Sequence, residues 1–327
     1  MRKKKGWRYV WDFLAGWQIF LGCLFRHAQI LSRTACPVCS TEGPPDAHWS
    51  HPIFAPNIKE NWLRVDGCVP CSVMSSIFTG AGAIVDRIKI NTLSREMRDG
   101  RPLWIKRRRW TAAPLMACAN SFFRLAGNPV RALAQPEVWQ RWEVNCFLAL
   151  HGEGFRAFAD GQWRVAADEV PGVNLTVHLD GGTMTPQMSV AAALELRRAH
   201  SRYCADFSGL WSHGDPHVGN FIYDEATGRA RLIDFEVMHH PALPAAERHA
   251  DDLLVFIQDM VGRISADLWM PNALAFLNAY GEPRILELLR EKLVVPQGMA
   301  RVWWAVRTTC LAPAELERRI SALRAAL

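Results

Sequence analysis

Residues 212–224 read SHGDPHVGNFIYD, and residues 232–236 read LIDFE. The apolar residues on either side of the intervening turn EATG predict two short strands of a β-hairpin. Such a hairpin brings Asn220, just before its first strand, and Asp234, just after its second strand, to the same end. Asp215 lies in the loop that leads into the hairpin. The sequence therefore predicts that two carboxylates and one amide face a single small volume.

This set of side chains suits phosphoryl transfer. The reaction needs a carboxylate that orients and deprotonates the attacking hydroxyl, and oxygen ligands for the Mg²⁺ that bridges the nucleotide phosphates. Asp215, Asn220 and Asp234 supply both functions. The alternative is a turn whose polar groups only satisfy one another. The agreement of loop, spacing, hairpin and second aspartate favours the chemical interpretation.

The two motifs resemble the catalytic loop H-G-D-x-H-x-x-N and the metal motif I-D-F-E or I-D-F-D of the protein-kinase-like superfamily. Within it, the similarity is to the aminoglycoside-phosphotransferase-like and lipopolysaccharide-kinase-like small-molecule kinases. It is close over residues 212–236 and looser over about 84–310. The resemblance implies that ATP is the phosphate donor, that Asp215 is the catalytic base, and that Asn220 and Asp234 hold Mg²⁺.

The resemblance also implies roles for residues elsewhere. His213 and His217 would brace the catalytic loop without ligating a metal. A lysine on an upstream strand would bind the α- and β-phosphates and pair with a helical glutamate. Lys106, on the second strand of a hairpin that the Asp99-Gly100 turn predicts, fits the first role, and Glu143, in an apolar helical pattern over 137–150, fits the second. Their alternatives are a solvated basic run, KRRR, and a surface charge.

Two further positions follow from the resemblance. Residues 167–175, ADEVPGVNL, look like the connection between the lobes of such kinases, where the backbone around Glu169 and Val170 would hydrogen-bond the adenine. Asp251 or Asp252 resembles the helical aspartate that supports the catalytic loop, although an acid at a helix N-terminus is the alternative.

The sequence also departs from the family pattern. No complete G-x-G-x-x-G precedes Lys106, and Gly80-Ala81-Gly82 is a weak candidate for a loop over the phosphates. The 36 residues between Lys106 and Glu143 leave an inserted apolar stretch. No A-P-E follows Glu236 and the next helix begins soon after it, so there is little platform for a peptide. A small-molecule or lipid-linked hydroxyl is therefore the expected acceptor.

The composition, and the order of strand and helix patterns along the chain, indicate the fold class. Of the 327 residues, 50% are hydrophobic and 21% charged, which excludes disordered, collagen-like and small disulfide-scaffold proteins. Strand patterns come first and helical patterns dominate later, which favours an α+β protein. We expect a two-lobed protein-kinase-like fold with an extra N-terminal segment. The expected parts are a basic, aromatic segment with a Pro-rich linker (1–60), a small β-rich N-lobe (61–172) and a helical C-lobe with the catalytic loop (173–327).

The N-terminal segment predicts contact with a membrane surface. The formal net charge is +6, and Arg2, Lys3, Lys4, Lys5 and Arg8 account for most of it. The uncharged run over 13–25 is too short to span a bilayer, and no cleavage site follows it. Interleaved tryptophans make the segment typical of an interfacial helix, with a core-packing helix as the alternative. We expect a cytoplasmic protein in peripheral contact with anionic lipid, and do not expect nucleic acid as a partner.

The cysteines pose a separate question. Nine cysteines, an odd number, without a secretory signal indicate reduced thiols. Two C-x-x-C pairs, Cys36 with Cys39 and Cys68 with Cys71, are each suited to placing two thiolates on one Zn²⁺. Their separation of 28 residues exceeds the usual spacing of about 15–20, so ordinary reduced cysteines in a Pro-rich connector are the alternative.

The sequence thus predicts an ATP- and Mg²⁺-dependent phosphotransferase that acts on a hydroxyl of a small molecule, a sugar or a saccharide-lipid. The missing glycine loop and the cysteine pairs motivate an alternative, a catalytically weak or inactive pseudokinase with a regulatory role and a zinc site. A nucleic-acid binder that uses the basic segment and the cysteines is a third reading. Intact Asp215, Asn220 and Asp234 favour the enzyme.

Overall fold

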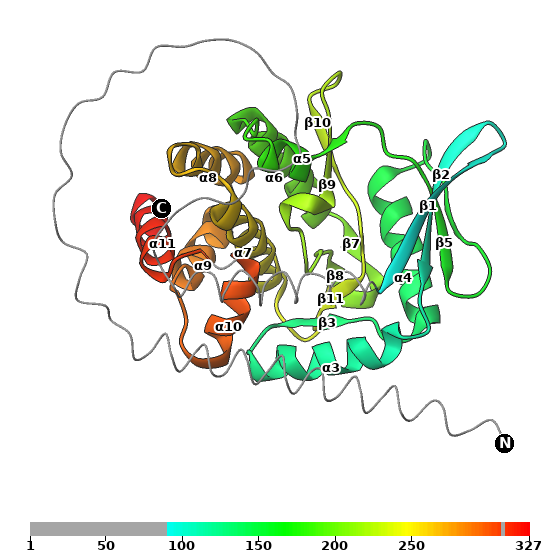
Figure 1. Cartoon of the computed structure of the whole chain (residues 1–327), viewed down its shortest axis with the longest axis horizontal. Helices are drawn as coiled ribbons and strands as arrows, with labels where there is room; N and C mark the ends of the chain where they lie inside the picture. The colour runs from blue at the N-terminus through cyan, green and yellow to red at the C-terminus, as the bar shows by residue number, and fades with distance from the viewer. Residues whose placement is uncertain (1–89, 309–310) are drawn as a thin grey trace, which may run out of the picture. The chain divides into compact units, whose positions relative to one another are not determined.

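The computed structural model describes residues 90–308 and 311–327, which belong to one compact unit, Lys89–Leu327 (Figure 1). This unit combines antiparallel sheets with helices, in agreement with the predicted α+β class. Within the described residues, no helix is both long and apolar enough to cross a membrane. The predictions that lie outside them concern the N-terminal segment, Gly80-Ala81-Gly82, and Cys36, Cys39, Cys68 and Cys71.

A four-stranded antiparallel sheet carries Lys106. In spatial order its strands are β1 (Asn91–Arg98), β2 (Arg101–Arg108), β5 (Arg164–Asp168) and β4 (Ala157–Ala159). β1 and β2 form the predicted hairpin, and its two turn residues both have positive φ. Leu103 and Ile105 are buried with Ala166 on one face of the sheet. Because side chains alternate along a strand, Trp104 and Lys106 face the opposite side.

Helix α4 (Pro136–His151) packs on this sheet and positions Glu143. It begins with a proline, whose missing N–H costs nothing in the first turn, and ends before Gly152, which has a φ of 78°. Its apolar residues recur at intervals of three and four and bury one face. Glu143 lies on that face and is 7% exposed. The alternative interpretation of Glu143 as a surface charge is therefore wrong.

A second antiparallel sheet supports residues 212–220, which we call the HGD loop. Its strands in spatial order are β10 (Arg229–Leu232), β9 (Phe221–Asp224) and β6 (Val173–Asn174). Phe221 pairs with Leu232, so the hairpin predicted between the two motifs is confirmed. Gly172 precedes β6 with a φ of 119°, and a Cβ there would collide with the backbone of Tyr223. Glycine thus allows the connection from β5 to lie against β9.

Two shorter pairings complete the strands. They are β3 (Val130–Ala132) with β11 (Val237–His239), and β7 (Tyr203–Cys204) with β8 (Gly209–Leu210). The stretch inserted between Lys106 and Glu143 forms helix α3 (Ala112–Leu125), which leads into β3. Since β11 directly follows the IDFE motif, the β3 pairing ties the inserted stretch to the region around Asp234.

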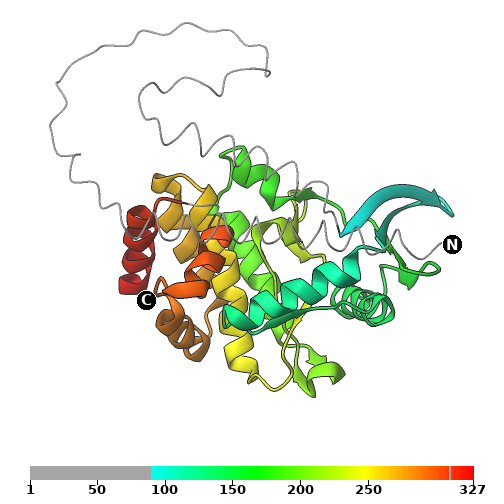
Figure 2. The ribbon, with the colours of Figure 1, turned by 60° about the horizontal axis from the view of Figure 1, so that its bottom comes forward.

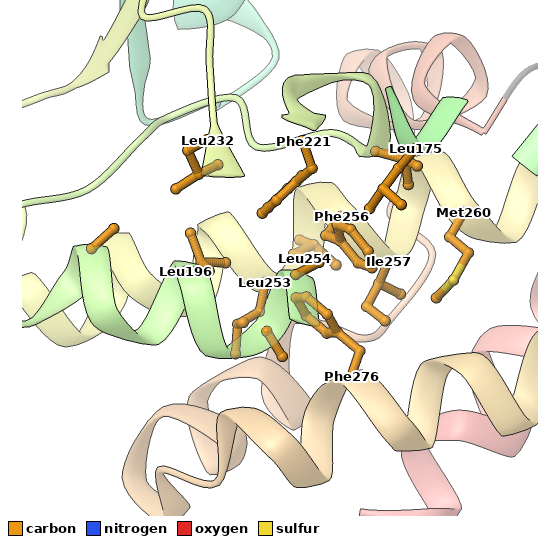
Figure 3. Packing of buried hydrophobic residues seen from close by; sticks show 14 of the residues in the cluster. Leu175, Leu196, Phe221, Leu232, Leu253, Leu254, Phe256, Ile257, Met260 and Phe276 are labelled. Carbon is orange, nitrogen blue, oxygen red and sulfur yellow. The ribbon is translucent and has the colours of Figure 1, made fainter. Parts of the chain in front are cut away.

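The remaining helices lie at one end of the described unit, with the four-stranded sheet at the other (Figures 1 and 2). They are α5 (Leu175–Asp180), α6 (Pro186–His200), α7 (Ala245–Arg263), α8 (Ala266–Tyr280), α9 (Pro283–Lys292), α10 (Gly298–Arg307) and α11 (Pro313–Ala326), with short 3-10 turns at Ala205–Phe207 and Val218–Asn220. Helix α7 is almost wholly buried. Its Phe256 stacks on Phe276 of α8 at a centroid distance of 4.0 Å and meets Phe221 of β9 edge-on at 5.5 Å (Figure 3). This core holds the HGD loop against α7.

Candidate active site

Helix α7 anchors the HGD loop through two carboxylates on one of its faces. Asp252 is fully buried and accepts the backbone N–H groups of His213 at 2.8 Å and of Gly214 at 2.7 Å. Asp259 accepts the N–H of Val218 at 2.9 Å. The two aspartates share a face because seven residues make close to two helical turns.

The structure distinguishes Asp252 from Asp251, which the sequence left as equal candidates. Asp252 supports the loop directly, and it also lies 2.9 Å from His200 Nε2 and 4.0 Å from His239 Nε2. Asp251 instead lies 3.2 Å from His239 Nε2, and the opposite nitrogen of that ring lies 2.9 Å from Ser212 Oγ. Burial raises the pKa of Asp252, but the neighbouring histidines outweigh this and hold it well below its ordinary value. Asp252 is therefore an ionised acceptor for the loop amides.

Gly214 lets the loop turn and present Asp215. Its φ is 87°, in the region that L side chains rarely adopt. A Cβ at this position would also lie 3.3 Å from Val237 Cγ2 and 3.4 Å from the backbone of Met238. Asp215 follows with its side chain 32% exposed, so its carboxylate is accessible from outside the loop.

Asn220 and Asp234 lie at the same end of the β9–β10 hairpin. Asn220 donates its Nδ2 hydrogen to the carbonyl of Asp215 at 2.8 Å, which leaves its Oδ1 as an acceptor. The N–H of Ile233 donates to the carbonyl of Asn220 at 2.9 Å. Asp234 comes next and has a φ of 68°, an unusual conformation for a residue other than glycine. Strained backbone of this kind clusters at functional sites.

Lys106 joins the two sheets by ion pairs. Its Nζ lies 2.6 Å from Glu143 Oε1, 2.6 Å from Asp234 Oδ1 and 3.6 Å from Glu236 Oε1. The second oxygen of Glu143 accepts the N–H of Phe235 at 3.1 Å. Burial alone would lower the pKa of Lys106, but the surrounding carboxylates outweigh it and raise the pKa above its ordinary value. Lys106 is thus a permanent cation between the upstream sheet and the IDFE motif.

Acidic groups dominate this centre. Burial raises the pKa of Glu236 to about 8, with the charges of Asp234 and Glu143 adding to the shift. Asn91 donates a hydrogen bond to the same side chain. Burial also acts on Asp234, but Lys106 outweighs it and holds the pKa of Asp234 below its ordinary value. A further cation at this point would relieve the repulsion among the carboxylates.

The oxygen donors of the centre fit Mg²⁺. Asp234 is 38% exposed, and its hydrogen bond to Lys106 uses only Oδ1. Asn220 Oδ1 is a second donor. Among residues 90–308 and 311–327, no three His, Cys, Asp or Glu side chains are arranged to hold a metal by themselves. Two protein oxygens are nevertheless enough for Mg²⁺, which usually takes its other ligands from substrate phosphates and water.

The two loop histidines differ in environment. His213 is 1% exposed, with Nε2 3.2 Å from the carbonyl of Ile233 and Nδ1 accepting the N–H of Asp215 at 3.3 Å. Burial lowers the pKa of His213 despite the acids around it. His217 Nδ1 accepts the N–H of Gly219 at 3.1 Å and lies 3.7 Å from Asp259. Burial would lower the pKa of His217 too, but Asp259 and Asp215 outweigh it and raise it.

Of the two residues predicted to contact the adenine, Glu169 and Val170, the first has its backbone N–H already engaged. The N–H of Glu169 already donates to the carbonyl of Pro102 at 3.0 Å, so this amide is not free for a nucleotide. The carboxylate of Glu169 pairs with Arg95 at 2.7 Å and accepts the indole N–H of Trp104 at 3.1 Å. The side chain of Val170 is 9% exposed and belongs to the hydrophobic core.

Two residues near the site were missed by sequence reasoning. Trp104 lies on the same strand face as Lys106, two positions earlier, and strand alternation is a signal that could have found it. Arg307, the last residue of α10, donates from Nη1 to Asp215 Oδ1 at 2.6 Å. No local pattern indicates this contact, because the two residues lie 92 positions apart.

Comparison with known proteins yields structural neighbours alone. No protein-family model and no curated protein sequence matches the chain. The complex of Rv3197 with erythromycin from Mycobacterium tuberculosis is similar over 73% of this chain and 70% of its own, at 19% identity and a TM-score of 0.33. The bifunctional kinase-methyltransferase WbdD is similar over 64% of this chain and 45% of its own, at 18% identity and a TM-score of 0.34.

Proposed function

We propose that this protein is an ATP- and Mg²⁺-dependent phosphotransferase of two-lobed, kinase-like architecture that acts on a hydroxyl of a small molecule, a sugar or a saccharide-lipid. The observation that carries the proposal is the pair of 2.6 Å contacts from Lys106 Nζ to Glu143 and Asp234. They link the β1–β2–β5–β4 sheet to the hairpin that holds Asn220. A buried lysine shared by a helical glutamate and a metal-binding aspartate is the arrangement that phosphoryl transfer uses to place a nucleotide.

In the proposed reaction, Asp215 accepts the proton of the acceptor hydroxyl. The hydroxyl oxygen forms a bond to the terminal phosphorus of ATP. The bond from that phosphorus to the bridging oxygen breaks, and its electron pair leaves with ADP. Lys106 binds phosphate oxygens, and the amides fixed by Asp252 keep Asp215 in place. Asp234 and Asn220 would hold Mg²⁺, which supplies neutralising charge on the phosphates.

Trp104 supports a place for the nucleotide base. It shares a face of β2 with Lys106, and its indole is fixed by the hydrogen bond to Glu169. An aromatic face beside a phosphate-binding lysine offers the base an apolar contact. We therefore place the adenine along β2 and the connection after β5.

The acceptor class is supported by the short chain between the metal motif and α7. After Glu236 the chain forms β11 and reaches the start of α7 at Ala245. A segment this short offers no extended surface for a peptide. A saccharide or lipid-linked hydroxyl remains our proposal for the acceptor, and residues 1–30 are proposed to hold the protein at anionic membrane. Zinc at the four cysteines is a separate proposal, checked by metal analysis of the purified protein.

The test is binding of ATP in the presence of Mg²⁺, measured by the thermal unfolding midpoint of the full chain. We expect stabilisation by MgATP in the wild type and little in Asp234→Ala, because that variant loses both a metal ligand and a partner of Lys106. Glu225→Ala, on the exposed turn of the same hairpin, serves as the matched control. Equal stabilisation of the wild type and Asp234→Ala would contradict the proposal.

A further inference from the structure

Arg307 reaches the site from the C-terminal helices and contacts the proposed catalytic base. Its side chain is 10% exposed, and Nη1 lies 2.6 Å from Asp215 Oδ1. Arginine carries five N–H donors in a rigid fork. The Nε of Arg307 is buried with no hydrogen-bond partner among the described residues. A buried donor without a partner is costly, so the side chain is incompletely satisfied as it stands.

One aromatic ring packs against the guanidinium of Arg307, and two others support that ring. Its Cζ lies 4.7 Å from the ring centroid of Trp303, one turn earlier on α10. Trp303 in turn packs edge-on against Phe122 at 6.0 Å and Phe123 at 5.2 Å. Both phenylalanines belong to α3, the inserted helix. The insertion therefore has a structural role, which is to support the residue that pairs with Asp215.

Arg307 acts on the Asp215 side of the site. It forms an ion pair with Asp215 at 2.6 Å, whereas Asp234 pairs with Lys106 at 2.6 Å. Its contact with Asp215 occupies one of the two oxygens that an acceptor hydroxyl could approach. An acceptor hydroxyl that takes this oxygen displaces the guanidinium, which then needs another partner. A planar fork with spare donors suits an oxyanion such as a phosphate or a carboxylate.

We propose that Arg307 binds an oxyanion carried by the acceptor, and that its ion pair with Asp215 is the resting state that this group replaces. The inference rests on the proposed function, because it assumes that the acceptor lies at Asp215. It narrows the acceptor class to acidic compounds, such as a phosphorylated or carboxylated saccharide. The terminal phosphate of the nucleotide is the other source of the same chemistry, and the experiment separates the two.

The first arm titrates inorganic phosphate into the full chain without nucleotide and follows binding by calorimetry. Asp215→Asn removes the charged competitor for Arg307, so we expect it to bind phosphate about tenfold more tightly than the wild type. Arg307→Gln should lose this binding, and Arg307→Lys should retain a weakened form of it. Arg301→Gln is the matched control, because Arg301 lies on the same helix and pairs with Glu317 at 3.5 Å. Unchanged phosphate affinity in either Asp215→Asn or Arg307→Gln would overturn the proposal.

The second arm compares ATP with ADP in the presence of Mg²⁺. An acceptor-binding Arg307 predicts that Arg307→Gln keeps the wild-type ratio of the two affinities. A selective loss of ATP affinity would assign Arg307 to the nucleotide and overturn the acceptor assignment. If the proposed function is wrong, the wild type will not bind MgATP. The phosphate titration can still be interpreted in that case, because it uses no nucleotide.

Discussion

Two groups of charges near the HGD loop are built differently: the Asp252 group on α7, which we call the rear group, and the group of Lys106 and Arg307, which we call the front group. In the rear group, Asp252 is fully buried, and described hydrogen bonds engage both of its oxygens. In the front group, Lys106 is surrounded by three carboxylates, and Arg307 keeps a buried donor without a described partner. A complete network fixes one conformation, whereas an incomplete one leaves binding capacity. The comparison indicates that the rear group holds the loop rigidly and that the front group is prepared for a ligand.

Removing the rear anchor should have the largest effect on stability. Asp252→Ala leaves the amides of His213 and Gly214 and the ring of His200 without their acceptor. Breaking a buried charged network costs about 3–5 kcal/mol of unfolding free energy. Urea denaturation should show this loss, with the half-exposed Glu282→Ala as the control. A loss below about 1 kcal/mol, the level of a surface pair, would mean that the rear network does not hold the loop.

Removing the front cation should lower activity, and it should also cost stability because the buried carboxylates lose their partner. Lys106→Met deletes the proposed phosphate contact, and loss of such an electrostatic contact typically lowers kcat about 10²–10³-fold. Arg107→Met is the matched control, since Arg107 is the exposed neighbour on the same strand. The measurement is Mg²⁺-dependent phosphoryl transfer or ATP hydrolysis. Equal rates in the two variants would show that Lys106 has no role in the reaction.

The loop turn should be sensitive to an added methyl group. Gly214→Ala places a Cβ at positive φ and 3.3 Å from Val237, which we expect to cost about 1–3 kcal/mol of stability. Gly228→Ala is the control, because Gly228 has a φ of 65° with nothing within 4 Å of its Cβ. The difference between the two unfolding free energies isolates the close contact. If the two variants lose equal stability, crowding beside β11 contributes nothing.

The smallest expected effect is on the pH dependence of stability, to which Glu236 and His249 contribute with opposite signs. The folded pKa of Glu236, about 8, lies above its ordinary value of 4.5, so the folded state binds more protons and stability falls as pH rises between these values. Burial lowers the pKa of His249 to about 3, so His249 acts in the opposite sense, with stability rising with pH up to about 6.5.

Glu236→Gln should therefore change the slope of the stability profile between pH 4.5 and about 8, and above pH 6.5, where His249 no longer titrates, the profile of the variant should be flatter than that of the wild type. The difference in slope should be at most about 1.4 kcal/mol per pH unit, the value for one proton. Denaturation midpoints at pH 6.5, 7.25 and 8 for both proteins give the measurement. His217, with its raised pKa, contributes to both proteins alike and cancels in the comparison. Parallel profiles would place Glu236 outside the buried centre.

Local sequence patterns predicted the helices and strands that carry the site, but they could not predict contacts between residues far apart in the chain. Apolar spacing and the turn residues predicted the hairpin between the motifs and the helix that carries Glu143. The spacing of Asp215, Asn220 and Asp234 followed from that hairpin. The contact between Arg307 and Asp215 arises from the packing of α10, for which no local signal exists. Likewise, the choice of Asp252 over Asp251 depends on which helix face meets the loop, and the amide of Glu169 was taken by a neighbouring strand.

The site also has a consequence for biosynthesis. Lys106 and Asp234 lie 128 positions apart in the chain, and Arg307 joins Asp215 over a further 92. Contacts of such long range form late, because the loop-closure entropy must be overcome first. A nascent chain that has emerged only as far as β10 contains Lys106, Glu143 and Asp215 but lacks Asp234, α7 and α10. The proposed nucleotide site should therefore form only after Asp234 and α7 have been synthesised.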